Sequence, residues 1–247
     1  MSTDGGRPYL SIVIPAYNEE DRLGVSLPLI EAYVRERGLD AEILIVDDGS
    51  TDGTAQMASA FLRGRRGRVL RHPENRGKGA AVRRGVLKAD GRWVLITDAD
   101  LSTPIEEHAK LAEIAREEDL DVAFGSRGLP ESQVEIRQNP LRQLMGKTFN
   151  VILRRITGLP HRDTQCGFKL LDRQRTRPLF ERMVIDHFAF DVELLFLCDR
   201  FGLRVKEIPV IWRNSERTTV NIVTAPPQML LDVLKVRWHF RRGLYNP

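Results

Sequence analysis

Short apolar segments alternate with longer amphipathic ones along the first half of the chain. The apolar segments, such as LSIVIPA at 10–16 and WVLIT at 93–97, have the length of buried strands. Between them, apolar residues recur at helical spacing, and Gly38 ends the first such segment. We therefore expect strands at 10–16, 42–46, 68–71, 93–97 and 120–124, and helices at 18–38, 51–62, 78–89 and 111–118. This alternation predicts an α/β fold with a mostly parallel, Rossmann-like sheet flanked by helices.

The second half of the chain is more polar and basic, most clearly at 128–162. Its patterns predict helices at 141–156 and 191–201, a strand at 205–212, and a terminal helix at 226–242. No repeat, low-complexity tract or linker interrupts the sequence. We expect one domain over 1–225, followed by an amphipathic, basic helix within 226–247.

Composition and charge narrow the class of protein. The 247 residues are 42% hydrophobic and 29% charged, which suits one large soluble domain and excludes a disordered or fibrous chain. The net charge of +4 fits a phosphate-bearing substrate or an anionic membrane surface as well as nucleic acid. Cys166 and Cys198 lack the paired spacing of a zinc site, and a reducing cytoplasm is the simplest interpretation. We see no secretory signal and no apolar run of the ~18 residues that span a bilayer.

Polar clusters follow the predicted strands directly. PAYNEE, DDGSTDGT, TDAD and GSR each come after one strand of the first half. In an open α/β sheet the ligand crevice lies outside the carboxyl ends of the strands. Four polar loops at one edge of one sheet therefore predict a binding site.

The acidic triplet Asp98-Ala99-Asp100 is the strongest candidate for chemistry within that site. Two carboxylates at a strand end can hold Mg²⁺ or Mn²⁺ beside a diphosphate, because these hard cations prefer oxygen ligands. The alternative is that Asp100 merely begins the following turn.

Two further loops have a ligand-binding and a structural interpretation. In DDGSTDGT, Asp47 and Asp48 can accept hydrogen bonds from a base or ribose, while Thr51 or Asp52 caps the next helix. In NRGKG at 75–79, glycines and cations precede a helix, which suits a phosphate or is simply a basic loop.

Taken together, these motifs resemble glycosyltransferase family 2, whose members have the GT-A fold. The resemblance rests on SIVIPAYNEE (11–20), VDDGSTDGT (46–54), NRGKGAAVRRG (75–85), TDADLSTP (97–104) and GSR (125–127). DTQCGFK (163–169) and FAFDVELL (188–195) are similar to the branch that transfers glucose or mannose to polyprenyl phosphates, nearest the dolichyl-phosphate β-glucosyltransferases. The resemblance implies a nucleotide-sugar half at about 8–127 and an acceptor half at about 128–225.

The resemblance also implies roles for individual residues. The donor contacts that it implies are Pro15, Ala16, Tyr17, Glu19, Asp47, Asp48, Lys78, Asp98, Ala99 and Asp100, of which Asp98 and Asp100 bind the metal. The acceptor contacts that it implies are Arg127, Gln165, Arg213 and Arg217, and the catalytic group is Asp100, Asp163 and Arg127. Two positions depart from the family: Ser102 stands where some relatives have a glutamine ligand, and 214–219 reads NSERTT in place of a Gly-x-Ser-Lys-like segment.

We therefore expect a metal-dependent, inverting hexosyltransferase that uses a nucleotide sugar, with UDP-glucose favoured over GDP-mannose, and a polyprenyl phosphate acceptor. A lipid phosphate is already anionic near neutral pH and needs no strong base, whereas a hydroxyl acceptor requires a carboxylate. Asp163 and Asp191 are candidates for that carboxylate, and a turn and a helix start are their structural interpretations. Arg127 could instead pair with a carboxylate such as Glu131. The alternatives are a soluble or polysaccharide hydroxyl acceptor, or a non-catalytic nucleotide-binding module; nucleic acid is not expected.

The terminal helix is the candidate membrane contact. Between Met229 and Arg242 it carries apolar residues at helical spacing together with cations: Leu230, Val233, Leu234 and Trp238, with Lys235, Arg237, Arg241 and Arg242. Such a helix can lie on the cytoplasmic face of an anionic membrane as a peripheral anchor. Alternatively, it packs this face on its own domain.

Overall fold

The computed structural model describes residues 6–135, 150–213 and 225–246. A seven-stranded sheet forms its centre, in the order β3-β2-β1-β4-β7-β5-β8. Its strands are β1 (Leu10–Ala16), β2 (Ala41–Asp47), β3 (Gly67–Arg71), β4 (Trp93–Ile96), β5 (Val122–Ser126), β7 (Lys169–Asp172) and β8 (Val205–Pro209). All neighbours are parallel except β7, which runs antiparallel to β4 and β5. The mostly parallel sheet predicted from the sequence is thus confirmed.

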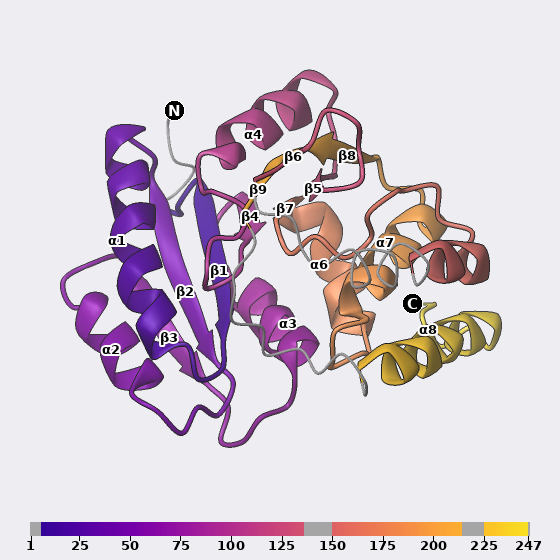
Figure 1. The fold of residues 1–247 in the computed structure, drawn as a ribbon, viewed down its shortest axis with the longest axis horizontal. Helices are drawn as coiled ribbons and strands as arrows, with labels where there is room; N and C mark the ends of the chain where they lie inside the picture. Colours follow the sequence, from indigo (N-terminus) through magenta and orange to yellow (C-terminus); the bar gives the residue numbers. More distant parts are fainter. Residues whose placement is uncertain (1–5, 136–149, 214–224, 247) are drawn as a thin grey trace.

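Helices cover both faces of this sheet (Figure 1). On one face lie α1 (Glu20–Glu36), α2 (Thr54–Phe61) and α4 (Glu107–Glu117); on the other lie α3 (Lys78–Lys88), α6 (Arg173–Arg182) and α7 (Phe190–Arg200). The alternation along β1 shows why two layers are needed: Ile12 and Ile14 enter one hydrophobic core, and Val13 enters the other. The side chains that β1 contributes to both cores are apolar, as expected for a strand buried on both faces.

The C-terminal helix α8 (Ala225–Arg241) packs on α7. Val233 and Val236 are fully buried in the same core as α7, and the buried Tyr245 hydroxyl donates to Glu193 at 2.6 Å. The terminal helix therefore shares the core of the domain. Within the described residues, no helix is both long and apolar enough to cross a bilayer.

Three elements were not predicted: α6, β7, and β6 (Gln133–Val134), which pairs with β9 (Ile211–Trp212). The sequence of α6, RQRTRPLFER, has little apolar periodicity, yet Asp172 caps it by accepting from the Arg175 amide, and Leu179 and Phe180 are buried. The predicted strand 205–212 divides into β8 and β9. Of the predicted helix 141–156, residues 141–149 lie outside the described residues, and 150–157 are helical.

The parallel strands β1, β2, β4 and β5 end at one edge of the sheet, at Ala16, Asp47, Ile96 and Ser126. The four polar clusters begin at these ends. The fold therefore brings them to the same edge, as the sequence predicts.

Candidate active site

The acidic triplet follows β4 and meets the first residue of α3. The Lys78 ammonium lies 2.6 Å from Asp98 Oδ1, and Asp100 Oδ1 accepts a hydrogen bond from the Ser102 amide at 2.9 Å. Burial alone would raise the pKa of Asp98, but the positive charges of Lys78, Lys169 and Arg127 outweigh it and lower that pKa. Asp98 is thus held in its ionised form.

Gly167 lets the loop before β7 approach Asp98. A Cβ atom at this position would lie 2.4 Å from Asp98 Oδ2, well inside van der Waals contact. The glycine therefore leaves room for the carboxylate, and any side chain here would displace it.

Asp48 holds the loop that delivers Lys78. Its carboxylate bonds His72 Nδ1 at 2.6 Å and accepts the backbone amides of Arg76 at 3.1 Å and Gly77 at 2.7 Å. Gly77 has a φ of 105°, and a Cβ there would lie 2.4 Å from the Asp186 carbonyl oxygen. Asp48 is 2% exposed, and its carboxylate holds this loop in place. Its contact with the donor stays a prediction, and His72 is a residue that sequence reasoning missed.

The other donor candidates line the ends of β1 and β2. Pro15 and Ala16 are buried in β1, Ala99 is buried beside the two aspartates, and Tyr17 is 39% exposed. Asp47 is fully buried: Oδ1 accepts from the Ser50 amide at 3.0 Å, and Oδ2 lies 2.9 Å from Arg71 Nε. The N-cap of α2 is Gly53 and not Thr51 or Asp52, so the predicted cap is wrong, although Asp52 accepts from the Thr54 amide at 3.0 Å.

Glu19 adds a further carboxylate to this edge, after the end of β1. Both of its oxygens accept from Arg22 Nη1, at 2.8 and 2.9 Å. Burial raises its pKa against the effect of Arg22, and the negative charges of Asp100 and Asp98 raise it further. Glu19 therefore lies within electrostatic reach of the acidic pair.

The buried Asp163 and the half-buried Arg127 form a bidentate pair at the end of β5. Arg127 Nε and Nη2 donate to the two oxygens of Asp163 at 2.7 and 2.9 Å, and the Arg127 amide donates at 3.0 Å. Burial would raise the pKa of Asp163, but Arg127 overcomes it and lowers the value to about 2. Arg127 thus pairs with a carboxylate, as the alternative interpretation expects, but its partner is Asp163 and not Glu131. A carboxylate with so low a pKa is a weak base, which argues against the catalytic-base role expected for Asp163.

A second buried pair lies behind Asp98. Lys169 Nζ on β7 is 2.6 Å from Asp191 Oδ1 on α7, and both residues are at least 95% buried. Burial raises the pKa of Asp191, against the effect of Lys169 and Lys78. Sequence reasoning missed Lys169, because β7 was not predicted; a fully buried lysine needs an ion partner, which Asp191 provides.

The predicted acceptor residues are only partly brought together. The Gln165 amide donates to Asp163 Oδ1 at 3.1 Å, which places it beside the Arg127 pair. The Arg213 amide donates to the Ser102 carbonyl at 2.7 Å, so this residue lies by the acidic loop, although its guanidinium donates to Glu135 at 2.9 Å. Arg217 lies outside the described residues.

The residues at the end of β4 fit a divalent cation as a partial ligand set. Asp98 and Asp100 each have one oxygen engaged within the protein, and Gly167 leaves space beside Asp98 Oδ2. Across the described residues, no group of three or more His, Cys, Asp or Glu side chains could hold a metal. An ion here would need oxygens from a phosphate or water to complete its coordination, as is usual for Mg²⁺.

Comparison with known proteins decides the family. The sequence model of Glycosyl transferase family 2 matches residues 11–180. The chain belongs to glycosyl transferase family 2. It is 36% identical to the dolichyl-phosphate beta-glucosyltransferase of Drosophila melanogaster, over 96% of this chain and 77% of that protein. It is 31% identical to the human protein of the same name, over 98% of this chain and 79% of that one. The chain is therefore a glycosyltransferase.

Solved structures of similar fold support the architecture. Glucosyl-3-phosphoglycerate synthase of Mycobacterium tuberculosis, in complex with Mn²⁺, UDP and glucosyl-3-phosphoglycerate, has a TM-score of 0.71 at 22% identity, over 94% of this chain and 80% of that one. Mannosyl-3-phosphoglycerate synthase of Rubrobacter xylanophilus has a TM-score of 0.70 at 20% identity, over 96% and 75% of the two chains. At these identities the likeness establishes the GT-A fold.

Proposed function

We propose that this glycosyltransferase moves glucose from UDP-glucose to a polyprenyl phosphate of the dolichyl type, with inversion at the anomeric carbon. The observation that carries the proposal is the acidic pair Asp98 and Asp100 beside Lys78, in a chain whose relatives named dolichyl-phosphate beta-glucosyltransferase match almost its whole length. Glucose is favoured over mannose because those relatives are named glucosyltransferases, and UDP is its expected carrier.

In the proposed reaction, an oxygen of the acceptor phosphate forms a bond to C1 of the sugar. The bond between C1 and the donor diphosphate breaks, and the nucleoside diphosphate leaves with the electron pair. Attack from the face opposite the leaving group converts an α-linked donor to a β-linked product. A divalent ion bound by Asp98 and Asp100 would stabilise the charge that grows on the leaving diphosphate. Lys78 adds a fixed positive charge beside Asp98, with no reorganisation during the reaction.

The charges at the end of β5 favour a phosphate acceptor over a hydroxyl. A hydroxyl nucleophile needs a base near neutral pH, whereas Asp163 has a pKa of about 2 and holds Arg127 in two side-chain hydrogen bonds. A phosphate is already ionised and needs positioning by a cation. We therefore assign Asp163 the role of orienting Arg127, and Arg127 the contact with the acceptor phosphate, with Gln165, Arg213 and Arg217 as further candidates.

The test is transfer of labelled glucose from UDP-glucose to dolichyl phosphate with Mg²⁺ or Mn²⁺, with GDP-mannose as the competing donor. Asp98→Asn and Asp100→Asn should each lower kcat by about a hundredfold or more, because metal stabilisation of a leaving group contributes several kcal/mol. Asp90→Asn is the matched control, since Asp90 precedes the opposite end of β4 and its side chain is 56% exposed.

The product identifies the acceptor. Glucosyl phosphate is cleaved by mild acid, whereas a sugar joined to an alcohol or polysaccharide hydroxyl resists the same treatment. An acid-resistant product would reject the lipid phosphate and favour a hydroxyl acceptor. Binding of UDP-glucose with neither transfer nor hydrolysis would indicate a non-catalytic nucleotide-binding module.

A further inference from the structure

The C-terminal helix α8 has two chemically different faces. Its inner face packs on the domain: Met229, Val233 and Val236 belong to the buried core. The acidic side chain Asp232 is also turned away from solvent, with 7% exposure. Val233, expected from the sequence to belong to a membrane-facing set, is thus a core residue. Packing on the domain explains the composition of the inner face of α8, but not that of its outer face.

The outer face of α8 carries an exposed apolar row. Leu231, Leu234 and Trp238 are 62%, 49% and 48% exposed, and their spacing of three and four residues places them on one side of a helix. We call these three residues the apolar row. Exposed large apolar side chains are ordinary when scattered, but a contiguous row on one helix marks an interaction surface.

Cations border the apolar row on both sides. Lys235 and Arg242 stand four residues after Leu231 and Trp238, and Arg242 lies 4.3 Å from the centre of the Trp238 ring. On the opposite border of the row lie Arg237 and Arg241. None of the exposed side chains described between 227 and 242 is acidic. Two copies of this face would repel each other, so its charge suits an anionic partner better than a second copy.

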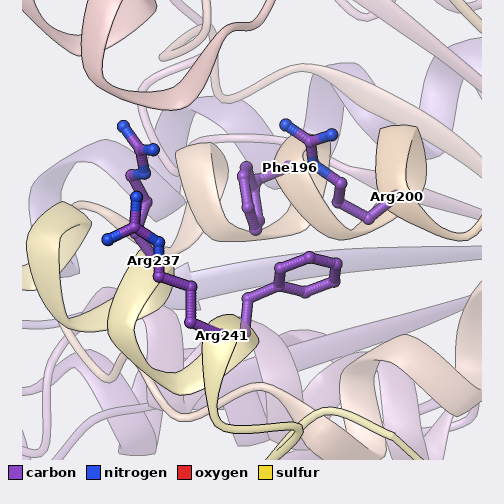
Figure 2. Close-up of a pocket in the computed structure, with 5 residues that line it drawn as sticks. Phe196, Arg200, Arg237 and Arg241 are labelled. Atoms are coloured by element: carbon purple, nitrogen blue, oxygen red, sulfur yellow. The ribbon is translucent and has the colours of Figure 1, made fainter.

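A pocket adjoins the border formed by Arg237 and Arg241 (Figure 2). The rings of Phe196 on α7 and Phe240 on α8 meet edge to face, 5.4 Å apart, and Arg200 lies over both of them. Figure 2 shows Arg237 and Arg241 extending together on one side of Phe196, with Arg200 on the other. The five residues line a pocket of about 180 Å³ that is open on one side to solvent. Three guanidinium groups around one small cavity are suited to a phosphate group, which arginine binds through paired hydrogen bonds.

We propose that α8 docks on the surface of a membrane that contains anionic phospholipid. In this arrangement the apolar row enters the boundary between headgroups and acyl chains, and the pocket between α7 and α8 receives a headgroup phosphate. The remaining cations lie along the headgroups, where long basic side chains keep their charge in water. The inference deepens the proposed function and rests on it, because an acceptor embedded in a bilayer requires the enzyme to work at that surface.

Vesicle flotation tests this surface with the full chain. Vesicles of phosphatidylcholine with phosphatidylserine are compared with vesicles of phosphatidylcholine alone, at low and high salt. Each cation near an anionic surface contributes about fivefold to partitioning, so the variant Lys235→Gln/Arg241→Gln/Arg242→Gln should bind about a hundredfold more weakly. The variant Leu231→Ser/Leu234→Ser/Trp238→Ser should also bind at least about tenfold more weakly. Because these side chains are exposed, both variants should keep the wild-type unfolding temperature.

Matched controls come from α1, α4 and the loop after α2. Val25→Ser/Leu29→Ser removes two side chains that are 68% and 53% exposed, and Arg35→Gln/Arg63→Gln/Arg116→Gln removes three exposed cations. Both should bind vesicles as the wild type does. Equal binding by the α8 variants and these controls would overturn the proposal.

The pocket has its own measurement. Arg241→Gln alone should weaken binding to phosphatidylserine vesicles, whereas inorganic phosphate at millimolar concentration should not displace the wild type, since the apolar row holds the lipid-bound form. Full displacement by inorganic phosphate would mean that the pocket binds free phosphate and that α8 is not a membrane surface.

Activity separates this inference from the proposed function. The α8 variants should transfer glucose to a short-chain, water-soluble polyprenyl phosphate at the wild-type rate, but lose transfer to acceptor embedded in vesicles. Vesicle binding without transfer to either acceptor would reject the proposed function and leave the docking surface standing. Transfer to both acceptors without vesicle binding would reject the docking surface.

Discussion

The pair of Arg127 and Asp163 allows the structure to be tested quantitatively. Asp163 is 5% exposed, and its pKa lies at about 2, against an ordinary value of 3.8. At 1.36 kcal/mol per pKa unit, this difference corresponds to about 2 kcal/mol of folding stability at pH 7. Because the pKa is lowered in the folded state, the contribution is complete above the unfolded pKa and is lost as the pH falls through about 2. About 1 kcal/mol of it should remain at pH 3.

Asp163→Asn removes the charge and keeps the shape. We expect its free energy of unfolding in urea to be lower than that of the wild type by about 2 kcal/mol at pH 7, and by about half as much at pH 3. Asp90→Asn is the control: Asp90 lies 2.9 Å from Arg68, at the surface, where the loss should stay below about 0.5 kcal/mol. A difference between wild type and Asp163→Asn that is the same at pH 7 and pH 3 would refute the ion-pair account.

The same variant distinguishes positioning from base catalysis. If Asp163 orients Arg127, Asp163→Asn should raise the KM for the lipid acceptor, leave the KM for UDP-glucose unchanged, and retain a measurable kcat. If Asp163 is the base, kcat should fall by about 10²-fold or more, and an acidic limb of the pH–rate profile should disappear. The second result would overturn our assignment.

Three further predictions concern the residues around the acidic pair. Gly167→Ala should lower kcat more than tenfold at unchanged urea stability, since its Cβ would lie 2.4 Å from an oxygen of Asp98; wild-type kcat would contradict this packing. Lys169→Met should lower the free energy of unfolding in urea by about 3–5 kcal/mol, because it leaves Asp191 buried and unpaired. Adding Asp191→Leu should recover part of that loss. Additive losses in the double variant would contradict the ion pair. Asp48→Ala should lower the unfolding temperature and raise the KM for the donor, because two backbone amides lose their acceptor; an unchanged unfolding temperature would contradict that role.

The elements of the first half could be predicted because each follows from local pattern. The strand at 10–16 is buried on both faces and is apolar at every position except Ser11, and the structure places β1 at those residues. The antiparallel strand β7 could not be predicted in the same way. Its four residues gain their strand conformation from β4 and β5 on either side, which are distant in sequence. Pairing of this kind leaves no periodic signal.

The site shows the same division between location and role. Strand ends place Asp98, Asp100 and Arg127 at one edge, and this follows from sequence order and the rule for parallel sheets. The hydrogen-bond partners of a residue do not follow from that rule. Asp48 resembles a ligand contact in sequence, yet its carboxylate binds three groups of the loop at 72–77. Hydrogen-bond partners depend on the final packing of distant loops, so a polar motif predicts a site more reliably than it predicts each residue's role.

The charges around Asp98 suggest why metal and donor should bind together. Lys78, Lys169 and Arg127 are matched by Asp98, Asp191 and Asp163, so the central network is close to neutral. Glu19 is paired with Arg22, and among the described residues Asp100 has no ion-pair partner. Such a carboxylate alone attracts a divalent ion weakly, and a diphosphate meets little net positive charge without the ion. When the ion and the diphosphate bind together, their charges neutralise each other. The affinity for each should therefore be higher when the other is bound.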